Sequence, residues 1–186
     1  MIGVLPTSLA VQDKEYKIRT DYRVALTILS AYNDYELNNF DKFLLTIEML
    51  YVDIPPKDNY KEAYEKAVWF LNMRDVEYNV KQPKLYDWEQ DESFIFSAIN
   101  KVIGKEIRNE EYCHWWTFLG YFNEISESTF NTLVCLRNKK TKGIKLTKEE
   151  QEFYRKNKEI VDLKIHPTTP EEVAQMSELE RLINPQ

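Results

Sequence analysis

Apolar residues recur at every third or fourth position along most of this 186-residue chain, which is the spacing of one face of an α-helix. The clearest stretch runs from residue 39 to residue 51 and stops before Pro55 and Pro56, because proline cannot continue a helix. Glycine is scarce, at four residues, which disfavours turn-rich sandwiches and phosphate-cradling loops. The pattern therefore predicts a mainly α-helical fold.

The same spacing predicts about seven helices after a short N-terminal β-hairpin. Leu9–Val11 and Tyr16–Ile18 are the expected strands, joined by a polar turn at residues 12–15. The expected helices begin near Thr20, Asn39, Asn59, Tyr86, Asn109, Ser126 and Thr147. Thr147 and Glu150 form a capping box, and Gly104 suits the end of the helix that starts at Tyr86. Residues 74–84 and 138–146 are expected to be loops.

The sequence predicts that the chain is organised as one domain followed by a C-terminal extension. Residues 1–164 form one compact helical domain with the hairpin. Residues 165–186 form a linker and a short, appended amphipathic helix, which opens with a second capping box at Thr169 and Glu172.

The net charge of −6 and the pI near 5.1 disfavour nucleic acid as a partner, because the mean field of the molecule repels phosphates. No apolar run approaches the length of a membrane span, so no membrane contact is expected. Neither Cys113 nor Cys135 lies in a CxxC motif, and the first residues do not resemble a signal peptide. These features favour a cytoplasmic protein with reduced thiols.

Two groups of ionisable residues are candidates for chemistry. His114 follows Cys113, but neighbouring residues on a helix do not face each other, so they cannot form a nucleophile–base pair. Asp87 and Asp91 would share a helical face, which leaves open a small metal-dependent enzyme; an acidic helix start is the simpler interpretation. No nucleotide-, zinc- or serine-hydrolase motif is present. We therefore expect a non-catalytic protein without metal or cofactor.

Two features are candidates for binding. Trp115 and Trp116 lie in the most aromatic segment and serve either as core or as an interface anchor. A run without acidic residues contains Arg137, Lys139, Lys140, Lys142 and Lys145. Residues 137–164 carry ten basic and five acidic side chains, a net of +5, which leaves −11 on the rest of the chain. The run is a solvated linker or a docking strip for an acidic surface, including that of another copy in a homo-oligomer.

Several blocks of sequence resemble one known family. They are residues 66–71 (KAVWFL), 86–91 (YDWEQD), 114–119 (HWWTFL) and 149–158 (EEQEFYRKNK), preceded by 5–9 (LPTSL) and 20–23 (TDYR). In this order they resemble the bacteriophage "gene-product-fifteen" family of tail proteins from phages and prophages of Gram-positive bacteria. The resemblance extends to about Leu163 and does not cover residues 165–186.

The resemblance implies a non-catalytic tail-assembly chaperone, because such proteins are typically encoded between the major tail protein and the tape-measure protein. A protein in that position would act in the host cytoplasm, bind the tape-measure protein and help to recruit tail-tube subunits. A structural virion component, such as a tail completion protein, is the alternative. The family implies no catalytic residue to carry over.

Overall fold

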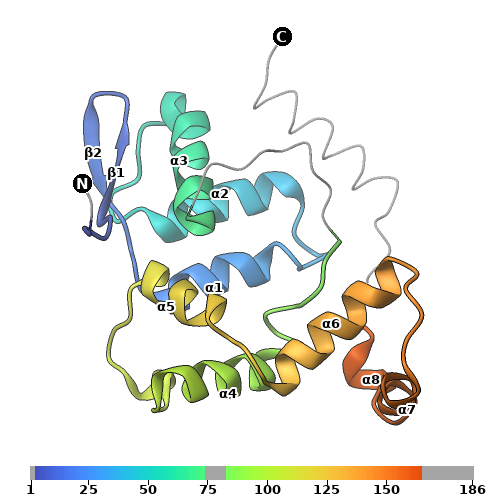
Figure 1. The fold of residues 1–186 in the computed structure, drawn as a ribbon. Coiled ribbons are helices and arrows are strands. Elements are labelled where there is room, and N and C mark those ends of the chain that lie inside the picture. Colours follow the sequence, from blue (N-terminus) through green and yellow to red (C-terminus); the bar gives the residue numbers. More distant parts are fainter. Residues whose placement is uncertain (1–2, 74–82, 165–186) are drawn as a thin grey trace. The chain divides into compact units, whose positions relative to one another are not determined.

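A computed structural model describes residues 3–73 and 83–164 (Figure 1). The described residues form two units, one of residues 3–73 with Tyr112–Trp116, and another of residues 83–111 with 117–164. Residues 74–82 of the expected loop at 74–84, and the expected helix within 165–186, lie outside the described residues.

The first unit begins with an antiparallel hairpin of β1 (Ser8–Val11) and β2 (Lys14–Lys17), in which Leu9 is paired with Tyr16. The hairpin confirms the sequence prediction, although its turn is shorter than expected. Gln12 has a φ of 51°, and a left-handed residue lets two strands meet across a tight turn. Leu9, Val11 and Tyr16 are buried, so one face of this small ribbon packs on the helices, as a lone hairpin requires.

Three helices complete the first unit: α1 (Tyr22–Ala31), α2 (Asn39–Leu50) and α3 (Tyr60–Asn72), with a 3₁₀ turn at Lys57–Asn59 before α3. The caps lie one residue away from two predicted positions. Asp21, not Thr20, caps α1, and its carboxylate accepts the Arg23 N–H at 2.9 Å. Thr20 is engaged elsewhere, because its carbonyl accepts the Trp115 N–H at 2.7 Å.

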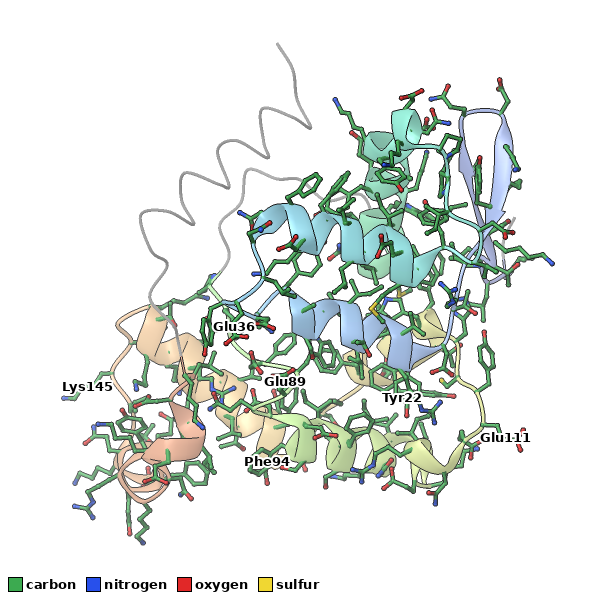
Figure 2. All side chains as sticks on the ribbon, turned by 180° about the vertical axis from the view of Figure 1, so that it is seen from behind. Tyr22, Glu36, Glu89, Phe94, Glu111 and Lys145 are labelled. Carbon is green, nitrogen blue, oxygen red and sulfur yellow. The ribbon has the colours of Figure 1, made fainter. Side chains whose placement is uncertain are left out.

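The apolar stripes of these elements converge in one core, in which Tyr22 (Figure 2) is 1% exposed. Burying large apolar side chains of this kind stabilises a fold by about 1.5–3 kcal/mol each. The buried residues are Leu9, Val11, Tyr16, Ile18, Tyr22, Ala25, Ile28, Phe43, Ile47, Leu50, Tyr51, Ala63, Ala67, Phe70, Leu71 and Trp115.

The second unit is helical throughout its regular structure. It contains α4 (Glu92–Ile103), a 3₁₀ turn at Ile107–Asn109, most of α5 (Trp115–Asn123), α6 (Thr129–Thr141), α7 (Lys148–Lys156) and α8 (Lys158–Val161). Two sequence predictions are confirmed. Gly104 ends α4 with a φ of 74°, and the capping box of Thr147 with Glu150 opens α7. Leu133, Leu136 and Val161 form a core cluster against which Phe94 (Figure 2) packs.

Two helices start later than their sequence pattern predicts. The expected helical turn at residues 86–91 is replaced by a non-helical turn, because the Asp87 carboxylate accepts the N–H groups of Glu89 and Gln90, each at 2.9 Å. The expected helix from Asn109 begins only at Trp115. Asn109 ends a 3₁₀ turn, and the residues just before Trp115 form a β-bridge between Asp21 and His114, in which the Cys113 carbonyl accepts the Tyr22 N–H at 3.0 Å.

The expected loop at residues 138–146 is helical up to Thr141, the last residue of α6. The helix ends in a Schellman motif at Gly143, which has a φ of 66°. There the Gly143 N–H bonds the Lys140 carbonyl at 3.1 Å, and the Ile144 N–H bonds the Lys139 carbonyl at 2.8 Å. The described part of the chain thus holds eight α-helices and one hairpin, which confirms the mainly helical fold class.

Candidate interaction surface

Trp115, the first residue of α5, is a core residue of the first unit. Its side chain is 1% exposed, and its Nε1–H donates to the Leu71 carbonyl at 2.9 Å. A tryptophan that is buried and hydrogen-bonded in this way joins α5 to the end of α3. Its predicted binding role is untested, and its indole is not accessible to a partner.

Trp116 is half-buried and also bonds to the end of α3. Its Nε1–H donates to the Phe70 carbonyl at 2.8 Å, and its ring lies 5.2 Å from that of Trp69 and 6.1 Å from that of Phe70. Such aromatic contacts fix the ring within the first unit. Of the two tryptophans, only Trp116 retains a partly accessible side chain.

His114 is 4% exposed, and both of its ring nitrogens have backbone partners. Nδ1 accepts the Trp116 N–H at 3.0 Å, and Nε2 lies 2.9 Å from the Pro6 carbonyl oxygen. These partners assign the neutral tautomer with the proton on Nε2, which donates to Pro6. The imidazole therefore connects the N-terminal segment to the start of α5, as expected of a structural histidine.

Arg137 has a different environment from the one that its basic sequence neighbourhood predicts. Its side chain is buried and forms a bidentate ion pair with Asp91, with N–O distances of 2.6 and 2.9 Å. The guanidinium also donates to the carbonyls of Val161 at 2.6 Å, Ile160 at 2.7 Å and Leu85 at 3.1 Å. All five of its donors are thus directed at acceptors, so Arg137 joins α8 and the segment before α4 to α6.

Asp91 is 0% exposed, and besides Arg137 it accepts the Asp87 N–H at 3.0 Å. The Asp87 carboxylate accepts a hydrogen bond from Lys84 at 2.6 Å and two from backbone N–H groups. Burial alone would raise the pKa of Asp87, but these donors outweigh it, and the pKa lies below its ordinary value. Both carboxylates are therefore acceptors that hold the turn before α4.

The alternative of a metal-dependent enzyme built on Asp87 and Asp91 gains no support from this arrangement. Within residues 3–73 and 83–164, no group of three or more His, Cys, Asp or Glu side chains is placed to hold a metal ion. The oxygens of Asp91 that a cation would need already face the guanidinium of Arg137.

Lys139 and Lys140, on the last turn of α6, form ion pairs inside the second unit. Lys139 donates to Glu150 at 2.6 Å, which connects α6 to the capping box of α7. Lys140 contacts Asp162 and also donates to the Tyr154 hydroxyl at 2.8 Å. Their positive charges are thus largely matched by carboxylates of α7 and the segment after α8.

Lys142 and Lys145 are the predicted binding residues that are exposed and form no ion pair within the described residues. They lie with Ile144 on the connection between α6 and α7, and Lys148 is the first residue of α7. Figure 2 shows Lys145 extending away from the ribbon. Across the described residues, the ammonium groups of these three lysines have no hydrogen-bond or ion-pair partner. We call the surface formed by Lys142, Ile144, Lys145 and Lys148 the α6–α7 loop.

Ile144 is the site residue that the sequence analysis missed. It follows the glycine of the Schellman motif, where a hydrophobic residue commonly packs back on its helix. Here the side chain is 51% exposed, between two unpaired lysines. The Lys-Gly-Ile-Lys sequence was the available signal, because a glycine followed by an apolar residue marks such a helix end.

These observations define a mainly helical protein in which most of the candidate catalytic groups serve the fold, and which exposes a cationic loop with an apolar centre. A family model described as bacteriophage Gp15 protein matches residues 1–163, so the chain belongs to this family and the resemblance of its sequence is confirmed. No curated protein and no solved structure gives a significant match. No helix in the described part of the chain is long and apolar enough to cross a membrane.

Proposed function

We propose that this protein is a non-catalytic tail-assembly chaperone, which binds the tape-measure protein and helps to recruit tail-tube subunits in the host cytoplasm. The observation that supports the proposal is the match of the bacteriophage Gp15 family model over residues 1–163. The family resemblance implies a gene position beside the tape-measure protein, whose long helices need a partner that keeps them in solution before assembly.

The α6–α7 loop is the surface that we assign to this partner. Its three lysines, which have no partner among the described residues, suit an acidic surface, and the exposed Ile144 offers an apolar contact close to them in the sequence. Because the loop follows a Schellman motif and precedes a capping box, its ends are fixed by α6 and α7. A loop held in this way loses little conformational freedom on binding.

Co-expression tests the proposal. The protein should raise the soluble fraction of the tape-measure protein encoded beside it and co-purify with it. The variant Lys142→Glu/Ile144→Asp/Lys145→Glu should lose this effect, whereas the control Lys61→Glu/Lys66→Glu, on exposed positions of α3, should keep it. An unchanged soluble fraction without co-purification would contradict the proposal.

The alternative is a structural virion component, such as a tail completion protein. Mass spectrometry of purified phage particles separates the two roles, because a chaperone is released and should be absent from mature virions. Stoichiometric amounts in the particle would favour the structural role instead.

A further inference from the structure

The described residues end near the last turn of α6, which precedes the α6–α7 loop. Asp162 contacts Lys140 of α6, and the Lys164 N–H donates to the Gln90 side chain at 2.9 Å. Two residues of extended chain span at most about 7 Å, so Lys164 lies close to the last turn of α6. The loop at Lys142 follows that same turn.

The 22 residues that follow Lys164 have a sequence complementary to the loop. Residues 165–186 contain four acidic side chains and one basic side chain, a net of −3 with His166 neutral. The acidic residues are Glu171, Glu172, Glu178 and Glu180, and Val173, Met176 and Leu179 lie between them at helical spacing. An acidic, amphipathic segment of this kind is complementary in charge to a loop whose three lysines have no partner among the described residues, and whose Ile144 is exposed.

We propose that residues 165–186 bind to the α6–α7 loop of the same chain, with their glutamates beside the three lysines and their apolar residues over Ile144. Because residues 165–186 belong to the same chain as the loop, their binding is favoured over that of a separate molecule. A segment joined to its site by a short stretch of chain has an effective concentration in the millimolar range, so even weak exposed ion pairs produce substantial occupancy. An extended chain of this length reaches about 70 Å, more than the distance requires.

Docking has a consequence for assembly, which rests on the proposed function. A partner that binds the α6–α7 loop must first displace residues 165–186, so the segment acts as a built-in competitor. The family match ends at residue 163, which makes this competitor a feature of the extension and not of the family body.

Paramagnetic relaxation in the full-length protein tests the docking without any partner. Cys135 is exposed on α6 and accepts a nitroxide label, whereas Cys113 is buried. About ten residues of helix and loop separate the label from Lys145, or roughly 15 Å if the helical rise continues. We expect the label to broaden the ¹⁵N-amide signals of residues 171–183 at low salt, and the broadening to weaken in 1 M NaCl. The control is the Cys135→Ser variant exposed to the same nitroxide reagent, in which any broadening comes from a label attached at another residue.

Charge reversal gives the decisive comparison. Lys142→Glu/Lys145→Glu/Lys148→Glu should abolish the broadening, and adding Glu171→Lys/Glu172→Lys/Glu178→Lys should restore it. The matched control Lys57→Glu/Lys61→Glu/Lys66→Glu changes the net charge equally, on exposed residues of the first unit, and should leave the broadening intact. No broadening in the original chain, or broadening that survives reversal of the loop, would overturn the proposal.

A mixed sample separates docking within one chain from docking between copies. Spin-labelled ¹⁴N protein mixed with unlabelled ¹⁵N protein should show no broadening, and broadening there would assign the segment to a second copy and overturn the same-chain arrangement. The regulatory consequence has its own readout: the Glu171→Lys/Glu172→Lys/Glu178→Lys chain should bind the tape-measure protein several-fold more tightly. If docking is observed but no variant binds that protein, the proposed function fails and the docking stands.

Discussion

The ion pair between Arg137 and Asp91 is buried within the second unit and bidentate, and it gives the sharpest prediction. Substituting Arg137 with Met replaces the aliphatic part of the side chain and removes the guanidinium, which leaves the fully buried Asp91 carboxylate without its counter-charge. Removing one partner of a buried ion pair costs about 3–5 kcal/mol. For a protein of this size that corresponds to a loss of roughly 6–20 °C in Tm.

A double-mutant cycle tests the reasoning more directly than the single variant. Asp91→Asn removes the second charge while keeping the shape of the side chain, so Arg137→Met/Asp91→Asn buries no unpaired charge. We expect the double variant to be more stable than Arg137→Met alone, with a coupling of about 2 kcal/mol between the two sites.

Hydrogen exchange is the suitable assay, because the two units need not unfold in one transition. Protection of the amides in α6 and α8 should fall in Arg137→Met, since Arg137 holds the Ile160 and Val161 carbonyls. Arg108→Met is the matched control, because it breaks an exposed ion pair with Glu106 and should change protection little. A cost below about 1 kcal/mol for Arg137→Met, or additive effects in the cycle, would refute the reasoning.

Three further predictions follow from single contacts. Trp115→Phe removes the donor to the buried Leu71 carbonyl and should lower the free energy of unfolding by about 1–3 kcal/mol in urea titrations; an unchanged value would mean that the bond adds nothing. Burial, and to a smaller extent the charge of Glu62, raises the pKa of Tyr51 in the folded state. The free energy of unfolding should therefore fall as the pH rises above about 10, and it should fall less steeply in Tyr51→Phe. Identical alkaline unfolding curves for the two proteins would contradict this. Hydrogen bonds from the Arg108 side chain hold the pKa of Glu106 at about 2. In Arg108→Met the pKa of Glu106 should return toward 4.5, as measured by a ¹³C NMR titration. A pKa that stays near 2 would assign the shift to other donors.

At acid pH, the free energy of unfolding should fall as the pH decreases, whereas at alkaline pH it should fall as the pH increases. A carboxylate whose pKa is lowered by folding contributes stability above its unfolded pKa and loses it as the pH falls through the folded value. Asp87 and Asp162 both have lowered pKa values despite partial burial, because Lys84 and Lys140 bond them. Loss of stability below about pH 4 should therefore begin in the second unit, as measured by hydrogen exchange at graded pH.

Much of the interaction surface could not be located from the sequence, and Arg137 shows why. In the sequence it opens a run of lysines and looks like a surface residue, but its partner Asp91 lies 46 positions away. Nothing local distinguishes it from Lys142, which is exposed. Trp115 and Trp116 are a similar case, because their exposure depends on the distant end of α3. The predicted strip therefore reduces to Lys142 and Lys145 as accessible charges, with Ile144 and Lys148 added.

The sequence alone determined what depends on short-range physics: the helical class, the hairpin, the capping box of Thr147 with Glu150 and the end of α4 at Gly104. These features arise from bonds between residues a few positions apart, so the local pattern contains all the necessary partners. Tertiary structure decided where helices start and which charges stay in water. The start of α5 was displaced by backbone bonds to Thr20 and Tyr22. Arg137 was buried by the Asp91 carboxylate of the turn before α4, because long-range partners outweigh local propensity wherever they satisfy a buried polar group.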